Sequence, residues 1–242
     1  MLKRSGAPLL DRAAVSSVLE RSETGPREPK LATGVAGLDE LLGGGIPRGG
    51  LSELTGPFSS GKTSLLFSIL AQATSDREAV AYIDAFDCFD PEFARRAGID
   101  LERLLWVRCG GGDARTGIVR ALKAADVLSR TDGFGVLALD LENPQGSCRA
   151  DLAKVPLNSW FRLKQTLRGK RTALVLVGER ACSGSASSVV LGLRRESADW
   201  KSPSEEAAKP APSHARLLRG IAGQARLLRG KKHGHVTLYC DF

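Results

Sequence analysis

A glycine-rich octapeptide, "GPFSSGKT" at residues 56–63, constrains the fold of this chain more than any other stretch. It has the spacing G-x-x-x-x-G-K-[ST], follows the apolar run "LSELT" and precedes the helical pattern "SLLFSILAQA". Such a loop turns its backbone N–H groups inward, and a helix that starts at its end adds a positive dipole. The octapeptide therefore predicts a buried strand, a phosphate-binding loop and a helix in immediate succession.

Short apolar runs alternate with helical patterns from residue 31 onward. The strand-like runs are mainly apolar: "GLSELTG", "AVAYIDA", "LLWVRC", "GVLALDL" and "TALVLVGE". Helical patterns separate them, among them "PEFARRAG", "IVRALKAADVLSR" and "NSWFRLKQTLR". Strands that are apolar on both faces and joined through helices predict an α/β fold, with a mostly parallel central sheet flanked by helices. We expect residues 31–242 to form this core.

The remaining segments predict appendages. Residues 1–30 hold one amphipathic pattern, "APLLDRAAVSSVLERS", and then "ETGPREPK", which together predict an N-terminal helical arm and a linker. Residues 196–214, "ESADWKSPSEEAAKPAPSH", are poor in apolar side chains and predict a flexible insertion. The hexapeptide "ARLLRG" then occurs at 215–220 and again at 225–230. This repeat predicts a basic C-terminal β-hairpin or a local duplication of one strand.

The formal net charge of +8 is concentrated in two runs that contain no acid. The first consists of Arg162, Lys164, Arg168, Lys170 and Arg171, and the second of Arg216, Arg219, Arg226, Arg229, Lys231 and Lys232. Basic clusters favour polyanions because binding releases counterions, although a solvated helix face and a soluble tail explain such runs as well. The five cysteines include no CxxC pair, and no apolar run approaches the ~20 residues that span a bilayer. We expect a cytoplasmic protein without membrane contact.

The phosphate loop supplies a candidate nucleotide site. Its candidate contact residues are Gly56, Pro57, Phe58, Ser59, Ser60, Gly61, Lys62 and Thr63. Lys62, the candidate catalytic lysine, would reach the β- and γ-phosphates, and Thr63 would hold Mg²⁺ through its hydroxyl. Asp140 ends an apolar run and is the candidate to orient Mg²⁺, directly or through water, with an ordinary strand-end acid as the alternative. Glu142, two residues further on, fits the metal less well.

Two segments resemble the RecA/RadA recombinase family. "TGVAGLDELLGGGIPRGGLSELTGPFSSGKTSLL" is similar to the entry segment of these proteins, and "AYIDAFDCFDPEFARRAGIDLERLL" to the segment after their phosphate loop. The similarity is strong over residues 33–109 and continues weakly but collinearly to the end of the chain. The resemblance implies a RecA-like core that binds ATP, Mg²⁺ and single-stranded DNA.

The resemblance also assigns roles to individual residues. It implies that Asp90 hydrogen-bonds the adenine and that Phe93 covers its ring. Arg229 and Lys231 fall where RecA-like chains offer cations to the ATP of a neighbouring subunit, and the repeat makes Arg219 an alternative register.

The chain departs from the family's motif at the residues that would take part in ATP cleavage. Phe86 stands at the position of the water-activating glutamate, and losing a positioned base slows a reaction by about 10²–10⁴-fold. Asp87 is the candidate replacement, and Asp84 a more distant one. Glu179 lies near the position of the glutamine that senses the γ-phosphate, where a charged residue is a substitution. We expect weak or absent hydrolysis.

Two further departures from the recombinase pattern indicate a particular type of RecA-related protein. The segment "RACSGSAS" is much shorter than the loop with which recombinases grip single-stranded DNA, and the chain ends at Phe242, where a separate C-terminal domain would follow. These features resemble the ImuA type of RecA-related accessory factor, which implies a role in DNA repair and the SOS-type damage response. The implied partners are RecA, translesion polymerase components or a second copy of the chain. Two alternatives stay open: a compact DNA-dependent ATPase and recombinase that uses Asp87, and a protein-only ATP-binding regulator.

Overall fold

The computed structural model describes residues 30–146, 148–201, 217–230 and 233–241. The expected N-terminal arm, residues 202–214 of the expected insertion, and Lys231 lie outside the described residues. What the sequence predicts for them stays a prediction.

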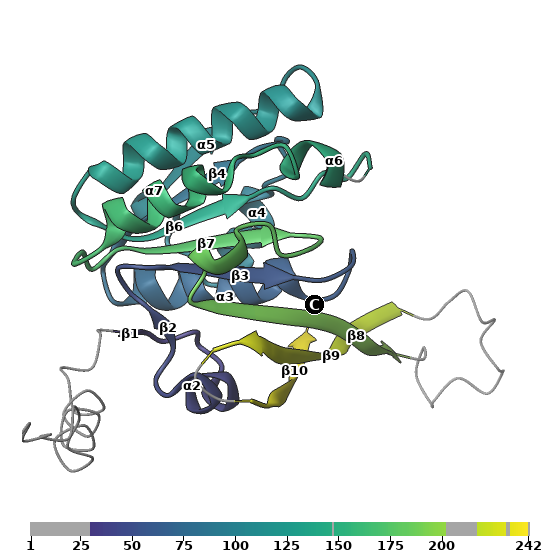
Figure 1. Ribbon diagram of the computed structural model, residues 1–242. Coiled ribbons are helices and arrows are strands. Elements are labelled where there is room, and N and C mark those ends of the chain that lie inside the picture. Colours follow the sequence, from purple (N-terminus) through teal and green to yellow (C-terminus); the bar gives the residue numbers. More distant parts are fainter. Residues whose placement is uncertain (1–29, 147, 202–216, 231–232, 242) are drawn as a thin grey trace, which may run out of the picture.

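The described strands of the main sheet form the centre of the fold (Figure 1). In chain order they are β3 (Leu51–Thr55), β4 (Ala79–Asp84), β5 (Leu104–Arg108), β6 (Phe134–Asp140), β7 (Ala173–Gly178), β8 (Val189–Lys201), β9 (Leu217–Arg229) and β10 (His235–Asp241). They lie side by side in the order β10, β9, β8, β3, β7, β6, β4, β5. Every pair from β8 to β5 is parallel, whereas β9 pairs antiparallel with both β8 and β10. The predicted α/β fold with a mostly parallel sheet is confirmed.

Helices cover both faces of this sheet. They are α2 (Ala36–Leu42), α3 (Lys62–Ser75), α4 (Pro91–Arg96), α5 (Ala114–Arg130), α6 (Arg149–Leu152) and α7 (Leu157–Leu167). Helices α5 and α7 pack on one face, and α3 lies on the other (Figure 1). The shorter pieces are β1 (Lys30–Leu31), β2 (Ile46–Pro47) and the 3-10 turns η1 (Leu101–Arg103) and η2 (Gly184–Ala186).

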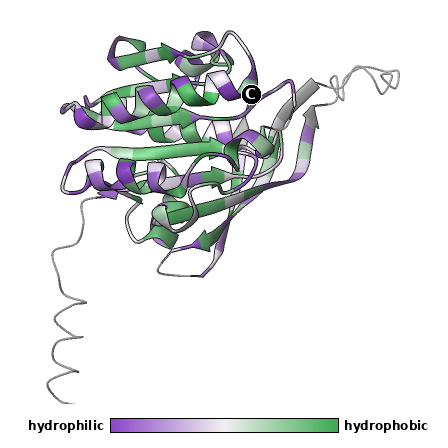
Figure 2. Ribbon diagram, turned by 45° about the horizontal axis from the view of Figure 1, so that its top comes forward, coloured by the Kyte–Doolittle hydropathy of each residue, from purple (hydrophilic) through white to green (hydrophobic). Residues whose placement is uncertain are grey.

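Strand β6 illustrates burial on both faces. Val136 and Ala138 belong to the apolar cluster that includes α3, and Leu137 and Leu139 to the cluster that includes α5 and α7. Because side chains alternate along a strand, each face of β6 buries its own apolar pair. The strands are mainly hydrophobic, and the helices carry polar residues on their outer sides (Figure 2). The continuous apolar runs in the sequence reflect this two-sided burial.

The central parallel strands end at one edge of the sheet. Their register pairs Thr55 at the end of β3 with Gly178 at the end of β7, and Asp84 at the end of β4 with Asp140 at the end of β6. In open α/β sheets, ligands bind in the crevice outside the carboxyl ends of the strands. The phosphate loop and the segments after β4, β6 and β7 therefore meet where a ligand is expected.

Strand β8 corrects the predicted start of the insertion. It continues to Lys201, so residues 196–201 belong to a strand that pairs with β9 rather than to a flexible segment. Backbone N–H and C=O groups form this ladder, and polar side chains therefore do not prevent it. Residues 217–220 of the first "ARLLRG" copy and residues 225–229 of the second lie in the single strand β9, which rules out a hairpin between the copies. The C-terminal hairpin forms instead between β9 and β10.

None of the described helices combines the length and the apolar character that a membrane crossing needs.

Candidate nucleotide-binding site

The phosphate loop connects the end of β3 to the start of α3. Ser59 and Gly61 have positive φ angles of 57° and 90°, which turn the loop toward the helix. A Cβ at Gly56 would lie 2.2 Å from the Leu193 carbonyl oxygen, so only glycine fits there. The Gly56 N–H donates to the Glu179 carbonyl at 3.1 Å. The loop is therefore held between β7 and β8 before it reaches the helix.

A cavity of about 170 Å³ opens inside this loop. Its described lining residues are Ser59, Ser60, Gly61, Lys62, Thr63, Ser64, Glu142, Ile221, Gly223 and Leu238. The last three come from β9 and β10, so the antiparallel strands of this same chain form the opposite wall. The Phe58 side chain is exposed, with its ring 5.9 Å from the Lys62 nitrogen.

Lys62 is almost fully buried and is held by oxygen atoms. Its Nζ donates to the carbonyls of Gly56 at 2.7 Å and Pro57 at 2.5 Å. The same nitrogen lies 3.0 Å from Oε1 of Glu142, whose side chain is 15% exposed. Among the described residues, Glu142 is the acid that lines this cavity. From the sequence, Glu142 was a weaker candidate than Asp140 for the metal contact. A second carboxylate just beyond the end of a strand was nevertheless a signal that the sequence contains.

Asp140 forms a buried pair with Tyr82. The Tyr82 hydroxyl donates to its Oδ2 at 2.5 Å, and the Glu142 backbone N–H donates to its Oδ1 at 2.9 Å. Burial raises the pKa of the Asp140 carboxyl to about 6. Burial, and then the Asp140 charge, raise the pKa of Tyr82 well above its ordinary value. Asp140 thus positions the backbone of Glu142 and is not among the cavity-lining residues described.

A larger cavity of about 820 Å³ continues from the phosphate loop along α3. It shares Gly61 and Leu238 with the first cavity and is also lined by Phe93 and Tyr239. The Phe93 ring lies 5.6 Å from that of Phe67 on α3. Its lining thus joins residues of α3 and α4 to residues of β10. Tyr239 was missed because only the pairing of β10 with β9 brings it here.

Asp90 caps helix α4. Its Oδ1 accepts the backbone N–H groups of Glu92 at 2.9 Å and Phe93 at 3.1 Å. This N-cap fixes the start of the helix that carries Phe93.

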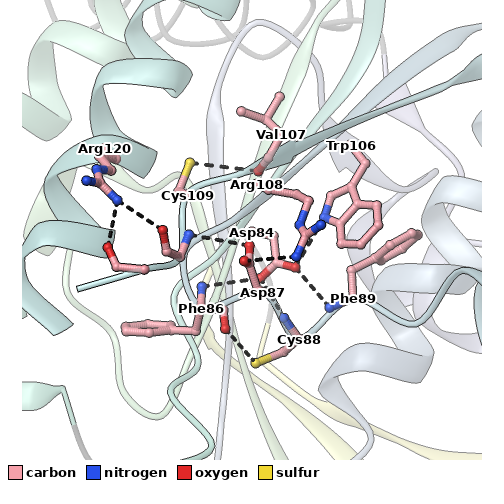
Figure 3. A network of polar contacts seen from close by, with 12 residues as sticks. Asp84, Phe86, Asp87, Cys88, Phe89, Trp106, Val107, Arg108, Cys109 and Arg120 are labelled. Carbon is pink, nitrogen blue, oxygen red and sulfur yellow. Dashed lines mark hydrogen bonds and ion pairs between the residues drawn. The ribbon is translucent and has the colours of Figure 1, made fainter. Parts of the chain in front are cut away.

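Asp84 organises the segment that follows β4 (Figure 3). Its carboxylate accepts the backbone N–H groups of Cys88 at 3.0 Å and Phe89 at 2.9 Å, and the Trp106 Nε1–H at 3.2 Å. The buried Asp84 carboxylate is therefore occupied by hydrogen bonds from the segment after β4 and from Trp106. The Phe86 ring points away from Phe89 and Trp106 in the same view.

Asp87 faces the edge of the sheet. It has a positive φ of 58° and pairs with Arg108 at 3.2 Å (Figure 3). Phe86 is half-buried and lines a separate cavity of about 110 Å³ with Gly110, Asp113 and Asn143. Neither residue is among those described as lining the phosphate-loop cavity.

Sequence comparison decides the family. Residues 16–142 match the family described as the RecA N-terminal domain. The chain belongs to this RecA family. The chain is 41% identical to Protein RecA of Gluconobacter oxydans over 111 residues, which cover 46% of this chain and 30% of the relative. It is 33% identical to Protein RecA of Rhodospirillum rubrum over 161 residues, covering 62% and 42%. With Protein RecA of Mannheimia haemolytica the identity is 35% over 147 residues, covering 59% and 38%.

The RecA match includes the phosphate loop, Phe93 and Asp140 and ends at Glu142. The chain spans less than half the length of these curated relatives. Strands β7 to β10 lie beyond the family match, and two of them, β9 and β10, supply one wall of the cavity.

Among the residues predicted beyond the match, Glu179 is not one of the described residues that line the phosphate-loop cavity, and the prediction that Arg229 and Lys231 contact the ATP of a neighbouring subunit stays a prediction. Glu179 lines a separate cavity of about 270 Å³ together with Cys148 and Cys182. Arg229 donates to the carbonyls of Gly184 and Ser187 in its own chain. Lys231 and the side chain of Arg219 are outside the described part of the protein.

A buried glutamate fixes the segment after β7. Glu53 on β3 accepts the Cys182 N–H at 2.8 Å and the Ser187 hydroxyl at 2.7 Å, and it also accepts the Ser183 hydroxyl. Glu53 is 1% exposed. Residues 180–187, the segment that is much shorter than the DNA-binding loop of recombinases, are therefore packed against the sheet. Sequence reasoning missed Glu53, which stands inside an apolar strand and had no local signal other than its charge.

Proposed function

We propose that this RecA-family protein binds ATP with Mg²⁺ and acts in the cytoplasm as an accessory factor in DNA repair and the SOS-type damage response. One observation carries the proposal: the phosphate loop surrounds Lys62, and neither Phe86, which stands at the position of the family's water-activating glutamate, nor Asp87 is among the described residues that line its cavity. Such a site holds a nucleotide and cleaves it weakly or not at all.

The donor set fits a magnesium-bound triphosphate. Lys62 offers a positive charge at the N-terminus of α3, where the helix dipole favours phosphate. Thr63 brings a hydroxyl into the same cavity, and Glu142 brings a carboxylate. Hydroxyl and carboxylate oxygens are the ligand types that Mg²⁺ accepts beside phosphate oxygens. When bound, Mg²⁺ would neutralise part of the phosphate charge.

The contacts of the other acids support weak hydrolysis. Asp84 is engaged by backbone and indole N–H groups, and Asp87 pairs with Arg108 on another side of the loop. A base must lie within hydrogen-bond reach of the water it activates. Asp87, which the active-ATPase alternative requires, therefore has no supporting geometry in this structure.

Two measurements on the same protein test the nucleotide proposal. Binding of a fluorescent ATP analogue with Mg²⁺ should be saturable in the wild-type protein and lost in Lys62→Ala. Phosphate release should stay near background with and without single-stranded DNA. Turnover that DNA stimulates and that disappears in Lys62→Ala would instead favour the active DNA-dependent ATPase.

A basic pair on the antiparallel strands is the candidate DNA contact. Strand register pairs Gly192 with Arg226 and Arg194 with Gln224, which places the two arginines on one face as diagonal neighbours. Arg226 is exposed, and so is Arg194, at 74% of its side chain. In the first basic run, Arg162 and Lys170 pair with aspartates at 3.2 and 2.8 Å, whereas Arg194 lies 4.0 Å from Glu196 and Arg226 has no ion pair among the described residues. The β8–β9 face is therefore the better-supported polyanion surface.

Point substitutions test this surface without removing a strand. Replacing Arg194 and Arg226 with alanine should weaken single-stranded DNA binding and lower the salt slope by about 2, roughly one per lost phosphate contact. Replacing Arg103 and Arg130, two exposed arginines that pair with acids on their own helices, is the matched control. Equal affinity and slope in both double variants would reject the surface. Absence of any salt-dependent DNA binding would favour the protein-only regulator.

The adaptor role rests on the resemblance to ImuA-type proteins and on the weak hydrolysis proposed above. We propose RecA or translesion polymerase components as partners, and self-association as a further mode. Size-exclusion chromatography of the purified protein, alone and mixed with RecA, with and without ATP, tests both. Unchanged elution in every mixture would count against the adaptor role.

A further inference from the structure

We infer that Glu142, rather than Asp140, supplies the protein carboxylate for the Mg²⁺ of a bound nucleotide, and that it holds Lys62 when the nucleotide is absent. The inference deepens the proposed ATP-binding function and rests on it. It starts from one contact: Oε1 of Glu142 lies 3.0 Å from the Lys62 Nζ, at the wall of the cavity that also contains Thr63.

Both carboxylate oxygens of Asp140 already accept hydrogen bonds. Tyr82 donates its hydroxyl to one carboxylate oxygen, and the backbone N–H of Glu142 donates to the other. A metal ion would have to take Asp140 away from Tyr82 and would need a path past the residues that bury it. Asp140 instead fixes the main chain from which the Glu142 side chain reaches the cavity. Its part is that of a positioning residue.

The charges around Lys62 explain why a cation is needed. The Glu142 carboxylate balances the charge of the buried Lys62. A triphosphate that binds Lys62 brings further negative charge to within a few ångströms of this carboxylate, where like charges repel strongly because water is scarce. Glu142 would hold a Mg²⁺ ion together with the phosphate oxygens, and the charge of that ion would remove the conflict, since Mg²⁺ commonly binds through one or two carboxylates together with phosphate oxygens. The Thr63 hydroxyl is available to the same ion.

A calorimetric comparison tests the inference through binding alone. ATP affinity is measured with Mg²⁺ and again in EDTA, for the wild-type protein, Glu142→Gln and Glu102→Gln. Glu102 is exposed in η1 and lies apart from the described lining of both cavities, so its substitution controls for the loss of one negative charge. The quantity compared is the factor by which Mg²⁺ strengthens ATP binding.

We expect this Mg²⁺ factor to fall about tenfold or more in Glu142→Gln, by analogy with losses at metal sites, and to stay unchanged in Glu102→Gln. Magnesium-free ATP should bind Glu142→Gln more tightly than the wild-type protein, because Lys62 is then not neutralised. Glu142→Asp, which keeps the charge on a shorter side chain, should recover part of the Mg²⁺ factor. Recovery in this variant also shows that the cavity remains folded.

Other outcomes overturn the inference. An unchanged Mg²⁺ factor in Glu142→Gln would mean that the metal carboxylate lies elsewhere. Tighter binding of magnesium-free ATP with an unchanged factor would leave Glu142 as a competitor for Lys62 and would equally reject the metal role. If the wild-type protein binds no ATP with Mg²⁺, the proposed function fails first and the metal role fails with it. The wild-type measurement thus separates the two failures.

Discussion

Asp84 and Trp106 join two neighbouring parallel strands through a side-chain hydrogen bond of 3.2 Å between the indole Nε1 and the carboxylate Oδ2. The same carboxylate accepts backbone N–H groups from the segment that leads to α4. Asp84 is 1% exposed, so hydrogen-bond donors of the protein, and not water, stabilise its carboxylate. The segment after β4 depends on it.

Asp84→Asn should destabilise the protein by about 2–4 kcal/mol. The amide has one acceptor oxygen where the carboxylate has two, and its NH₂ group would face buried donors. Urea unfolding followed by tryptophan fluorescence measures the loss. Asp87→Asn is the matched control in the same segment, and since Asp87 forms a partly exposed pair with Arg108, it should cost less than about 1 kcal/mol. Equal losses in the two variants would contradict the assignment.

Glu53→Gln should destabilise the protein by about 2–4 kcal/mol and loosen residues 180–188. The glutamine would bring two N–H donors toward groups that themselves donate, the Cys182 N–H and the hydroxyls of Ser183 and Ser187. Hydrogen exchange resolved by peptide should rise in residues 180–188 before it rises in α5. Ser187→Ala, which removes one donor, should cost about 1 kcal/mol. Unchanged exchange in residues 180–188 of Glu53→Gln would show that the segment is held by other contacts.

Phe86→Glu should not create a fast ATPase. Phe86 lines the cavity with Gly110 and Asp113, whereas Lys62 lines another, so a carboxylate at position 86 would not approach the phosphates. A charged group at this half-buried position should also lower the free energy of unfolding, by about 1–3 kcal/mol. Phosphate release and urea unfolding check both statements, with Phe86→Leu as the apolar control. A tenfold rise in turnover in Phe86→Glu alone would place position 86 beside the nucleotide.

Cys88 should react slowly with iodoacetamide although it is exposed. Partial burial, and then the Asp84 charge, raise the pKa of this thiol to about 11, and the thiolate is the reactive form. At pH 8 the thiolate fraction is then about one in a thousand, and labelling should accelerate about tenfold per pH unit toward pH 11. Mass spectrometry of the labelled peptide measures the rate. Urea-unfolded protein is the control, and equal rates in both states at pH 8 would contradict the raised pKa.

The local sequence determined the fold class and the phosphate loop. Each apolar run that became a central strand is buried on both faces, and the spacing of Gly56, Gly61, Lys62 and Thr63 sets the loop between β3 and α3. These features depend on residues close together in the chain. The segment 196–201 was wrongly predicted to be flexible because its composition is polar. It pairs through backbone hydrogen bonds with β9, a strand that follows it by some twenty residues.

Only the tertiary structure decided which side chains meet. Glu142 faces Lys62, and Asp140 does not, because Tyr82 from the neighbouring strand holds the Asp140 carboxylate away. Tyr239 reaches the cavity of Phe93 because β10 pairs with β9. A periodic pattern specifies the faces of one strand or helix, whereas the contacts between carboxylates, hydroxyls and the lysine depend on how strands far apart in sequence are ordered in the sheet.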